Sequence, residues 1–433
     1  MGNSQAAPSD PRLATAMRSF TKSELDDLKS LFKSLAVQAQ NDGKFVTPSV
    51  FQAYFGIHEP LGSRLFDLVT QKRNDGKLTF EDLVIAKAVY EKGSPREIED
   101  FIYQLVDVNG DDMVGRSDLE AVLTSVLSAI FSSSNAENGV VSCHEVFDAF
   151  LNAATFSKKI EGCAETSMSM EDFRIWCNLL PSLRKFLGGL MMPPDPGNLG
   201  SHIPHLSYPE HVNSDLVILR KEYAWHIGGA LSQDQLEAWK LLYHSSINGL
   251  SFNTFFGSIT AEDGPTILLI KDKEGYVYGG YASQPWDRRS DFYGDMKSFL
   301  FQLYPRASIF RPTGANHNLQ WCAVNFSSAS IPNGIGFGGQ VNHFGLFLSE
   351  SFDHGHTFRI ATCLIWSGLR ILVNELNVWC LWSATSEYEI TVQQSGLECI
   401  PNSVLCFYRY PFDLYLVTTY GFYYLVRVDG IDS

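Results

Sequence analysis

The sequence predicts a multidomain α+β protein, with an N-terminal all-α region and a C-terminal antiparallel β-sandwich that carries a few helices. Three observations predict this fold class. Apolar residues recur at helical spacing across residues 20–190. A stretch rich in proline and glycine follows at Met191–His205. Beyond about Leu216 the pattern changes to short β-branched and aromatic runs separated by turns.

Length, composition and charge limit the number of domains and the kinds of partner that the chain can have. A chain of 433 residues suggests two to three domains, and 45% apolar against 19% charged residues allows sizeable cores. The formal net charge is −15, from 48 acidic and 33 basic residues. This balance argues against nucleic acid as the main partner, because phosphate binding needs a basic surface. It suits divalent cations or a basic protein surface instead.

Cysteine spacing and hydropathy favour a cytoplasmic protein. The eight cysteines form no C-x-x-C pair, so neither a zinc ribbon nor a compact disulfide framework is indicated. No secretory signal opens the chain, and no long uncharged apolar run occurs. The nearest such run, Ser403–Val426, is interrupted by Arg409 and Asp413.

The N-terminus, residues 1–19, is expected to be flexible. Gly2 stands at the acceptor position for N-myristoylation, although Ala6 departs from the Ser or Thr preferred there. One myristoyl chain binds membranes marginally. The alternatives are therefore a lipidated end that touches a membrane surface and an unmodified, frayed end.

Residues 20–190 are predicted to form a string of helix–loop–helix units. Thr21-Lys-Ser-Glu24 is a capping box, and leucines follow it at helical spacing. Further amphipathic segments are Leu61–Thr70, Phe80–Glu91, Arg96–Val106, Asp118–Phe131, His144–Phe156 and Met170–Leu187.

The strongest chemical pattern in this region is a metal-ligand spacing. The segment reads Asp107-Val-Asn-Gly-Asp-Asp-Met-Val-Gly-Arg-Ser-Asp118. In an EF-hand loop, positions 1, 3, 5 and 12 supply side-chain oxygens and position 7 supplies a carbonyl. Val114 occupies the apolar position that pairs with a neighbouring loop. The expected ligands of one Ca²⁺, or Mg²⁺, are Asp107, Asn109, Asp111, the Met113 carbonyl and Asp118.

Two departures lower the expected affinity. Asp112 stands where the loop turns sharply and Gly is usual, although Asp tolerates left-handed backbone better than most residues. Asp118 replaces the longer Glu, which weakens two-oxygen coordination and shifts the preference toward Mg²⁺. The alternative is an acidic turn that binds no metal.

Other loops look like decayed relatives of this one. Gln71–Asp82 has Gln71 and Arg73 where carboxylates belong and is expected to stay empty. The loop around Gly43 and the segment Ser134–Glu145 also lack ligands. Ser169–Phe173 resembles the exiting edge of one more unit. Residues 20–190 are therefore predicted to be an EF-hand-like domain with one ion.

Residues 191–215 are predicted to be an extended linker, and the second domain begins at residue 216. A helix is expected near Gln233–Tyr243. Strands are expected at Thr266–Lys271, Tyr276–Ala282, Phe299–Leu303, Leu319–Asn325 and Phe344–Leu348. Because no helices of the βαβ kind separate them, an antiparallel sandwich is favoured over a parallel sheet.

One glycine-rich stretch imitates a dinucleotide-binding loop. Gly334, Gly336 and Gly339 have the spacing G-x-G-x-x-G. A dinucleotide site needs a helix after the glycine turn, because the pyrophosphate rests on the helix N-terminus. A strand is predicted after it, so no nucleotide is expected. Gly334, Gly336, Gly338 and Gly339 are expected to form a loop between strands that allows close approach of a partner or of neighbouring chain.

Eight separated blocks in residues 216–358 resemble a known family. They include Trp239–Phe255, Gly264–Asp272, Gly275–Trp286, Tyr293–Asp295, Ser298–Phe301, Thr313–Asn316, Pro332–Gln340 and Phe344–Leu346. In this order and spacing they resemble the TLDc domain of the oxidation-resistance protein family. The family's fold is a β-sandwich with a few helices, and no established catalytic chemistry comes with it.

An EF-hand-like region ahead of such a domain, with Met1-Gly2, is similar to the mTOR-associated, lysosome-linked EF-hand/TLDc proteins. The resemblance implies a Ca²⁺-responsive, non-enzymatic adaptor that binds and regulates the vacuolar-type proton ATPase through its peripheral subunits. It also implies links to oxidative-stress resistance and growth signalling. The implied location is cytoplasmic, and peripheral on lysosomal or vacuolar membranes.

The alternative function is an antioxidant enzyme or thiol-based redox sensor. His356, with His343 and His317 upstream, has loose spacing for a metal cluster, so histidines in surface turns are favoured. Cys322 stands in an apolar strand, which favours a buried, inert sulfur. Ser298 lacks the G-x-S-x-G elbow of a serine nucleophile. No catalytic residue is therefore predicted.

Residues 359–433 depart from the family pattern. They hold no lysine or histidine, yet four of the eight cysteines and three of the eight tryptophans. They either complete the sandwich in divergent form or are a splice-derived tail, which would leave apolar edges exposed. A membrane-seeking tail is a further alternative.

Overall fold

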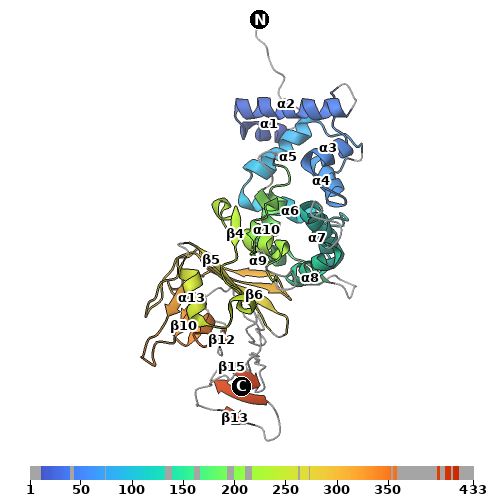
Figure 1. Ribbon diagram of the computed structural model, residues 1–433. Helices are drawn as coiled ribbons and strands as arrows, with labels where there is room; N and C mark the ends of the chain where they lie inside the picture. Colours follow the sequence, from blue (N-terminus) through green and yellow to red (C-terminus); the bar gives the residue numbers. More distant parts are fainter. Residues whose placement is uncertain are drawn as a thin grey trace. The chain divides into compact units, whose positions relative to one another are not determined.

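The computed structural model describes most of the chain as two compact units (Figure 1). It describes residues 11–39, 43–73, 75–131, 139–159, 166–192, 199–209, 217–261, 264–272, 274–352 and 355–357, and the strands at 397–399, 405–410 and 413–418. Unit 1 comprises Met1–Ile203 and Trp225–Leu236; unit 2 comprises Pro204–Ala224 and Glu237–Ser433.

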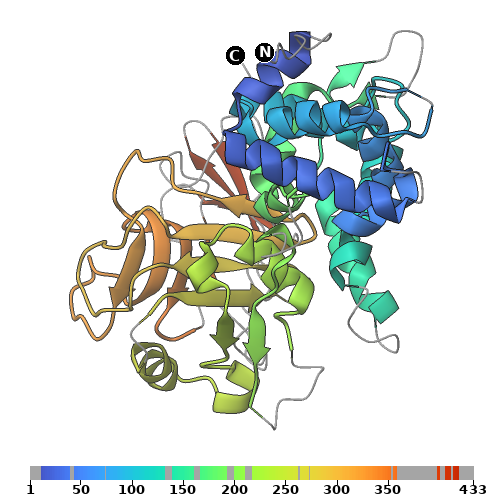
Figure 2. The ribbon, with the colours of Figure 1, turned by 90° about the horizontal axis from the view of Figure 1, so that it is seen from above.

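Unit 1 is built mainly of helices. They are α1 (Pro11–Arg18), α2 (Lys22–Gln38), α3 (Pro48–Phe55), α4 (Leu61–Val69), α5 (Phe80–Lys92), α6 (Pro95–Val106), α7 (Arg116–Phe131), α8 (Gly139–Asn152), α9 (Met170–Leu179) and α10 (Pro181–Gly188), with the 3₁₀ turn η1 (Leu199–Ser201) and the short strands β1 (Lys158–Lys159) and β2 (Thr166–Ser167). The long helix α2 is the dark blue helix at the front of Figure 2. Most helical segments that the sequence predicts are confirmed, and those at α4 to α7 agree to within two residues.

The helix–loop–helix units are joined in pairs by single β-bridges between their loops. Val46 pairs with Leu78, which joins the loop before α3 to the loop before α5. Val114 pairs with Met168, and the Met168 N–H donates to the Val114 carbonyl at 2.8 Å. The prediction that Val114 pairs with a neighbouring loop is therefore confirmed.

Helix starts are fixed by reciprocal side-chain caps. The predicted box at α2 is confirmed: the Thr21 N–H donates to Glu24 Oε2 at 2.7 Å, and the Glu24 N–H donates to Thr21 Oγ1 at 3.3 Å. The Lys92 hydrogen bond and those from Thr21 lower the pKa of Glu24 to about 2. The same device begins α5 (Thr79 and Asp82), α6 (Ser94 and Glu97) and α9 (Ser169 and Asp172).

The predicted segment Met170–Leu187 is two helices rather than one. Helix α9 ends at Leu179 and α10 begins at Pro181. Leu180 has φ −119° and ψ 67°, outside the helical region. Proline disfavours helical backbone at the residue before it and has no N–H to continue the ladder, which explains the break.

A short segment, Trp225–Leu236, completes the core of unit 1. It contains the second half of α11 (Lys221–Gly228) and the 3₁₀ turn η3 (Gln233–Gln235). Trp225 is 1% exposed; its ring stacks on Phe150 with centroids 5.8 Å apart, and its Nε1–H donates to the Gly200 carbonyl at 2.6 Å. The tryptophan thereby satisfies its one polar group inside the core.

Unit 2 contains two four-stranded antiparallel sheets, so the predicted fold class is confirmed (Figure 2). One sheet has the order β5-β6-β7-β8 and the other the order β12-β11-β10-β9. The strands are β5 (Thr266–Lys271), β6 (Val277–Ala282), β7 (Phe299–Tyr304), β8 (Ser308–Phe310), β9 (Gln320–Ala323), β10 (Gly334–Gln340), β11 (His343–Ser349) and β12 (Gly355–His356). The five strands predicted from the sequence match β5, β6, β7, β9 and β11 to within two residues.

The core of unit 2 draws on both sheets, as in a sandwich. Leu268 and Ile270 of β5 belong to the same buried cluster as Ile335 and Phe337 of β10. Helices α12 (Ser245–Asn248) and α13 (Phe252–Thr260) precede the sheets, and Phe255 of α13 joins the cluster.

The prediction of a helix near Gln233–Tyr243 is wrong. The segment forms the single turn η3 and then strand β4 (Ala238–Lys240), which pairs in parallel with β3 (His205–Ser207). The apolar spacing there is too short to hold a helix when a neighbouring extended segment offers backbone hydrogen bonds.

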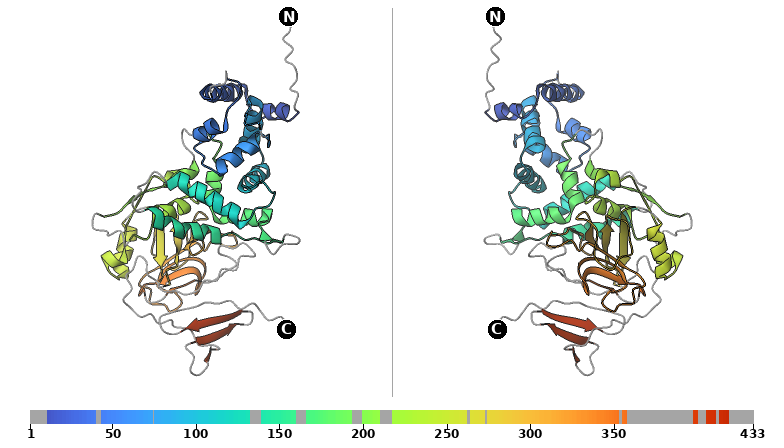
Figure 3. Two further views of the ribbon diagram at one scale, coloured as in Figure 1. Left: turned by 90° about the vertical axis from the view of Figure 1, so that its right-hand side faces the viewer. Right: turned by 90° about the vertical axis from the view of Figure 1, so that its left-hand side faces the viewer.

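Near the C-terminus, β13 (Leu397–Cys399), β14 (Leu405–Tyr410) and β15 (Asp413–Thr418) form an antiparallel three-stranded sheet, shown in red in Figure 3. Residues 359–396 lie outside the described part, so the alternatives for the divergent tail stay open. Within the described ranges, no helix has the length and hydropathy to span a bilayer.

Candidate functional site

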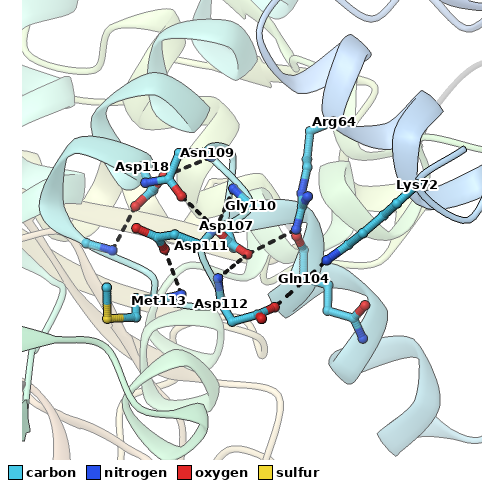
Figure 4. A network of polar contacts seen from close by, with 11 residues as sticks. Arg64, Lys72, Gln104, Asp107, Asn109, Gly110, Asp111, Asp112, Met113 and Asp118 are labelled. Atoms are coloured by element: carbon cyan, nitrogen blue, oxygen red, sulfur yellow. Dashed lines mark hydrogen bonds and ion pairs between the residues drawn. The ribbon is translucent and has the colours of Figure 1, made fainter. Parts of the chain in front are cut away.

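The predicted metal loop, between α6 and α7, is ordered around the carboxylate of Asp107 (Figure 4). Asp107 Oδ1 accepts the N–H groups of Gly110 at 2.9 Å and Asp111 at 3.2 Å. Its Oδ2 accepts the Asp112 N–H at 3.2 Å. The first side chain of the loop thus holds the backbone of the fourth, fifth and sixth residues.

The other predicted side-chain ligands also accept hydrogen bonds within the loop. Asn109 Oδ1 accepts the Asp111 N–H, and Asp111 Oδ1 accepts the Met113 N–H, both at 2.9 Å. Asp118 accepts the N–H groups of Asn109 at 3.4 Å and Gly115 at 2.8 Å. Hydrogen bonds within the loop and the first turn of α7 therefore involve all five predicted ligand residues.

Asp112 adopts the left-handed conformation that its position in the loop requires. Its φ is 63°, a region where Asp is tolerated better than β-branched or bulky residues. The sharp turn therefore forms without glycine at this position. Gly110, two residues earlier, also has a positive φ, of 75°.

Arg64 of α4 is a further residue of this site, which the sequence prediction missed. Its Nη2 lies 3.0 Å from Asp107 Oδ2, and both side chains are buried, at 6% and 4% exposure. Its Nε–H donates to the Gln104 carbonyl at 3.0 Å. In Figure 4, Arg64 approaches Asp107 from the side away from Asn109, Asp111 and Asp118. No spacing rule within the loop could reveal it, because α4 is distant in sequence.

The donor types fit a hard cation, since carboxylate, amide and carbonyl oxygens are what Ca²⁺ and Mg²⁺ take. In the conformation described here, carboxylate oxygens of Asp107 and Asp118 accept hydrogen bonds from N–H groups of the loop, and Asp107 also pairs with Arg64. Among the residues that the structure describes, no three His, Cys, Asp or Glu side chains are gathered as metal ligands. The metal site therefore stays a prediction.

The glycine-rich stretch is a strand, which corrects the predicted loop. Gly334–Gln340 forms β10, between β9 and β11 in its sheet. Ile335 and Phe337 point into the core between the sheets. Gly334 and Gly336 occupy the alternate positions, and a Cβ on Gly336 would lie 3.0 Å from the Phe344 ring. The glycines are explained by aromatic side chains packed directly on the strand.

Gly338 and Gly339 have positive φ, of 64° and 85°. Their backbone groups bond outside the hairpin: the Gly338 N–H donates to the Leu319 carbonyl at 3.1 Å, and Asn318 Nδ2 donates to the Gly339 carbonyl at 2.8 Å. Left-handed backbone at two consecutive residues favours glycine at both.

The exclusion of a dinucleotide site is supported by the local geometry. After β10 the chain turns at Val341–Asn342 and enters β11 directly. No helix follows whose N-terminus could hold a pyrophosphate. The resemblance of Gly334, Gly336 and Gly339 to a nucleotide motif rests on spacing alone.

The two cysteines with described side chains are buried. Cys322 in β9 is 0% exposed, and burial raises the pKa of its thiol to about 12. Burial likewise raises the pKa of the Cys177 thiol to about 12. A thiolate is the reactive form, so neither residue suits a redox sensor.

His356 lies in strand β12 rather than in a surface turn. Its ring stacks on Phe347 with centroids 5.1 Å apart. Burial, with a smaller contribution from His343, lowers the pKa of His356 to about 4. His317 is exposed. Gly2 lies outside the described residues, as do the first five residues of Ser134–Glu145.

Ser298 belongs to a polar network that holds the sandwich rather than to a catalytic arrangement. Ser283 Oγ donates to Asp295 Oδ1 at 2.7 Å and lies 2.8 Å from Ser298 Oγ. Ser298 Oγ donates to Gln320 Oε1 at 3.3 Å, and Gln320 Nε2 donates to the Gln284 carbonyl at 3.0 Å. Burial acts against ionisation of Asp295, but the hydrogen bonds, led by that from Ser283, lower its pKa overall. Among the described hydrogen bonds of this network, none involves a histidine or lysine side chain that could act as a base.

Comparison with known proteins identifies the domain in unit 2. Residues 212–379 match the family model described as the TLDc domain. This range continues past Phe358, where the match by motif ends.

The similar proteins are named after signalling and oxidation resistance. MTOR-associated protein MEAK7 of Mus musculus is 31% identical over 184 residues, which cover 41% of this chain and 40% of that protein. The Danio rerio protein of the same name is 35% identical over 157 residues, or 35% and 34% of the two chains. Oxidation resistance protein 1 of Xenopus tropicalis is 28% identical over 144 residues, or 33% and 16%. The aligned part thus spans less than half of each relative. The sandwich, the matched range and these similarities together show that the chain carries a TLDc domain.

Proposed function

We propose that this chain is a non-enzymatic adaptor whose TLDc domain binds peripheral subunits of the vacuolar-type proton ATPase and regulates the pump. The observation that carries the proposal is the TLDc match over residues 212–379. The choice of partner rests on the resemblance to that family. Similarity to proteins named mTOR-associated and oxidation resistance supports a role in growth signalling and in resistance to oxidative stress.

The interior chemistry of the sandwich favours an adaptor over an enzyme. Ser283 donates a hydrogen bond to Asp295 and Ser298 donates one to Gln320, and these bonds hold the strands. A serine nucleophile needs a base that can take its proton during attack. A carboxylate with a lowered pKa is a poor base for that purpose.

The helical unit is proposed to be an EF-hand-like scaffold that makes the adaptor Ca²⁺-responsive. Support comes from the paired loops, bridged at Val114 and Met168, and from the oxygen donors of the loop Asp107–Asp118. The cation, Ca²⁺ or Mg²⁺, would be held by Asp107, Asn109, Asp111, the Met113 carbonyl and Asp118. The chain's own carboxylates hold the loop backbone in place for it.

The proposed location is the cytoplasmic face of lysosomal or vacuolar membranes, reached through the pump and through Gly2 if it is acylated. Mass spectrometry of the N-terminal peptide from eukaryotic cells tests the acylation. A Gly2 peptide without the added myristoyl mass would leave the pump as the membrane contact.

The experiment that tests the function is capture of the purified peripheral ATPase sector by the full chain, in Ca²⁺ and in chelator. Retention of the sector, with altered pump activity, is the expected result. Absence of capture in both conditions would overturn the adaptor proposal. A matched chain with Gly334→Ala, in which Leu348 collides with the added methyl, is expected to lose capture because the sandwich is disrupted.

The alternative, an antioxidant enzyme or thiol-based sensor, receives a direct test in the same preparation. An enzyme would consume peroxide catalytically without stable capture of the pump. Among the cysteines whose side chains the structure describes, we expect no such turnover from Cys177 or Cys322, since both thiols are buried.

A further inference from the structure

In the loop Gln71–Asp82, between α4 and α5, an arginine side chain binds the oxygen atoms that would coordinate a cation in an EF-hand loop. The guanidinium of Arg73 donates from Nη1 to Asp82 Oδ1 at 3.0 Å and from Nη2 to Asp82 Oδ2 at 2.6 Å. Nη2 also donates to the Lys77 carbonyl at 3.0 Å. Its Nε lies 3.8 Å from Asp75 Oδ2.

These three partners stand at defined loop positions. With Gly76 at position 6, Asp75 is at position 5, Lys77 at position 7 and Asp82 at position 12. Positions 5, 7 and 12 supply a carboxylate, a backbone carbonyl and a two-oxygen carboxylate to the ion in an EF-hand loop. Arg73 itself is at position 3, so its side chain reaches across the loop to the remaining donors.

The loop keeps the backbone bonding that is seen in the loop Asp107–Asp118. The Lys77 N–H donates to Asp75 Oδ1 at 3.1 Å, as the Met113 N–H donates to Asp111 Oδ1 at 2.9 Å. The Thr79 N–H donates to Asp82 Oδ2 at 2.9 Å, which matches the 2.8 Å bond from the Gly115 N–H to Asp118. The loops differ at their start, since Gln71 has φ 58°.

We propose that Arg73 is a built-in cation, which takes the place of a metal ion in the loop Gln71–Asp82 and keeps it closed without metal. The proposal rests on the EF-hand-like interpretation of unit 1 given above, and it concerns a different loop. The pair of loops joined by Val46 and Leu78 would then need no metal ion, whereas the loop Asp107–Asp118 is the one proposed to bind an ion.

Charge and burial support this assignment. The Asp82 side chain is 3% exposed, whereas that of Arg73 is 42% exposed and reaches inward from the surface. A buried carboxylate needs a positive partner or several donors. The planar guanidinium meets both carboxylate oxygens at once, which a lysine ammonium does less well. An arginine side chain stays protonated in proteins, so this charge is permanent, and the hydrogen bond to Asp82 raises the pKa of Arg73 further.

The test compares melting of the full chain with Arg73→Ala and with Arg116→Ala. Arg116 is the matched control, because its pair with Glu120 is an exposed i,i+4 contact at 3.1 Å. In chelator, Arg73→Ala is expected to lower the melting temperature by about 3–6 °C, and Arg116→Ala by about 1 °C or less. Equal melting of the two variants would overturn the proposal.

A second measurement separates a cation site from an ordinary ion pair. Arg73→Ala vacates the space among Asp75, the Lys77 carbonyl and Asp82, so Ca²⁺ is expected to raise its melting temperature by more than it raises that of the wild type. The same increment in both chains would overturn the cation-site assignment. If Ca²⁺ does not affect the wild type, the proposed response of Asp107–Asp118 fails, while the difference between the chains still tests Arg73.

Arg73→Lys keeps the charge and removes the planar fork, and it covers the case in which Arg73→Ala does not fold. It is expected to melt below the wild type in chelator. Melting at the wild-type temperature would show that the bonds across the loop contribute nothing, and would overturn the proposal.

Discussion

Arg64 of α4 and Asp107 of the predicted metal loop form a buried ion pair with 3.0 Å between Nη2 and Oδ2. Arg64→Met would leave the Asp107 carboxylate inside the protein without its cation. Removal of one partner of a buried pair costs about 3–5 kcal/mol. We expect a loss of this size in the free energy of unfolding, measured by urea denaturation in chelator.

Lys72→Met is the matched control for Arg64→Met. Lys72 also pairs with a loop aspartate, Asp112, but at 3.9 Å and with exposures of 54% and 88%. An exposed pair contributes about 0–1 kcal/mol. Adding Asp107→Asn to Arg64→Met removes the unpaired charge, so part of the stability should return. Equal losses for Arg64→Met and Lys72→Met would contradict the importance of burial here.

Calcium should stabilise the Arg64→Met chain more than the wild type, if Asp107 is a ligand. The bound ion would supply the positive charge that Arg64 no longer gives, and binding to the folded state raises the unfolding free energy. The measurement is the Ca²⁺-dependent shift in melting temperature of each chain. Identical shifts would speak against Asp107 as a metal ligand.

The second prediction concerns the glycines of β10. A methyl on Gly334 would lie 2.2 Å from the Leu348 carbonyl oxygen, at a φ of 149°. Gly334→Ala is therefore expected to cost about 3 kcal/mol in unfolding free energy. Gly336→Val and Gly339→Val are expected to destabilise as well, through the Phe344 ring and through positive φ respectively.

Gly264→Ala is the control for the glycine series, because nothing lies within 4 Å of its added methyl. It should melt with the wild type. Nucleotide titrations should stay flat for the wild type and all variants. Binding of a dinucleotide that is lost in Gly336→Val would reverse the assignment of β10 as a structural strand.

How far the sequence predicts the fold depends on whether the deciding contacts are local. The capping box of Thr21 and Glu24 lies within one helical turn, so its residue types suffice. The strands flanking β10 follow from their own β-branched and aromatic content. In β10 only Ile335 and Phe337 are of this kind and the glycines outnumber them; Phe344 and Phe347, which explain the glycines, lie on the next strand.

Prediction of the candidate site from the sequence has the same limit. The ligand spacing from Asp107 to Asp118 is visible in sequence, and the bridge at Val114 follows from it. Arg64 is not visible, because its contact with Asp107 depends on the packing of α4 beside α6. Arg73 is visible as a departure from the ligand pattern, but its bonds to Asp82 require the folded loop.

The third prediction concerns pH and His226. The ring is 0% exposed; its Nδ1 lies 3.3 Å from Ser182 Oγ, and among the described residues Nε2 has no hydrogen-bond partner. Burial lowers the pKa of His226 to about 3, from 6.5. The unfolded chain therefore binds more protons than the folded chain between these values, and stability falls as the pH falls from 6.5 toward 3.

The slope attributable to His226 is at most about 1.4 kcal/mol per pH unit. His226→Phe keeps an aromatic ring beside Phe150 and removes the titration, so its urea stability should fall less steeply between pH 6.5 and pH 5. His317→Phe, which replaces an exposed histidine, is the control for the change from histidine to phenylalanine. Parallel profiles for all three chains would contradict the prediction.

The last prediction tests the redox alternative through Cys322. Its thiol is buried beside Ile335 and Leu346 in the sandwich core, with a pKa raised to about 12. At pH 8 the thiol is therefore almost entirely protonated, and burial blocks reagents as well. Iodoacetamide should leave Cys322 unmodified in the native chain and label it fully in denaturant, as peptide mass spectrometry can show. Cys177 is also buried, and burial also raises the pKa of its thiol, so it should behave alike. Rapid labelling of Cys322 in the folded protein would instead favour a thiol sensor, since the strand that carries it would have to open under native conditions.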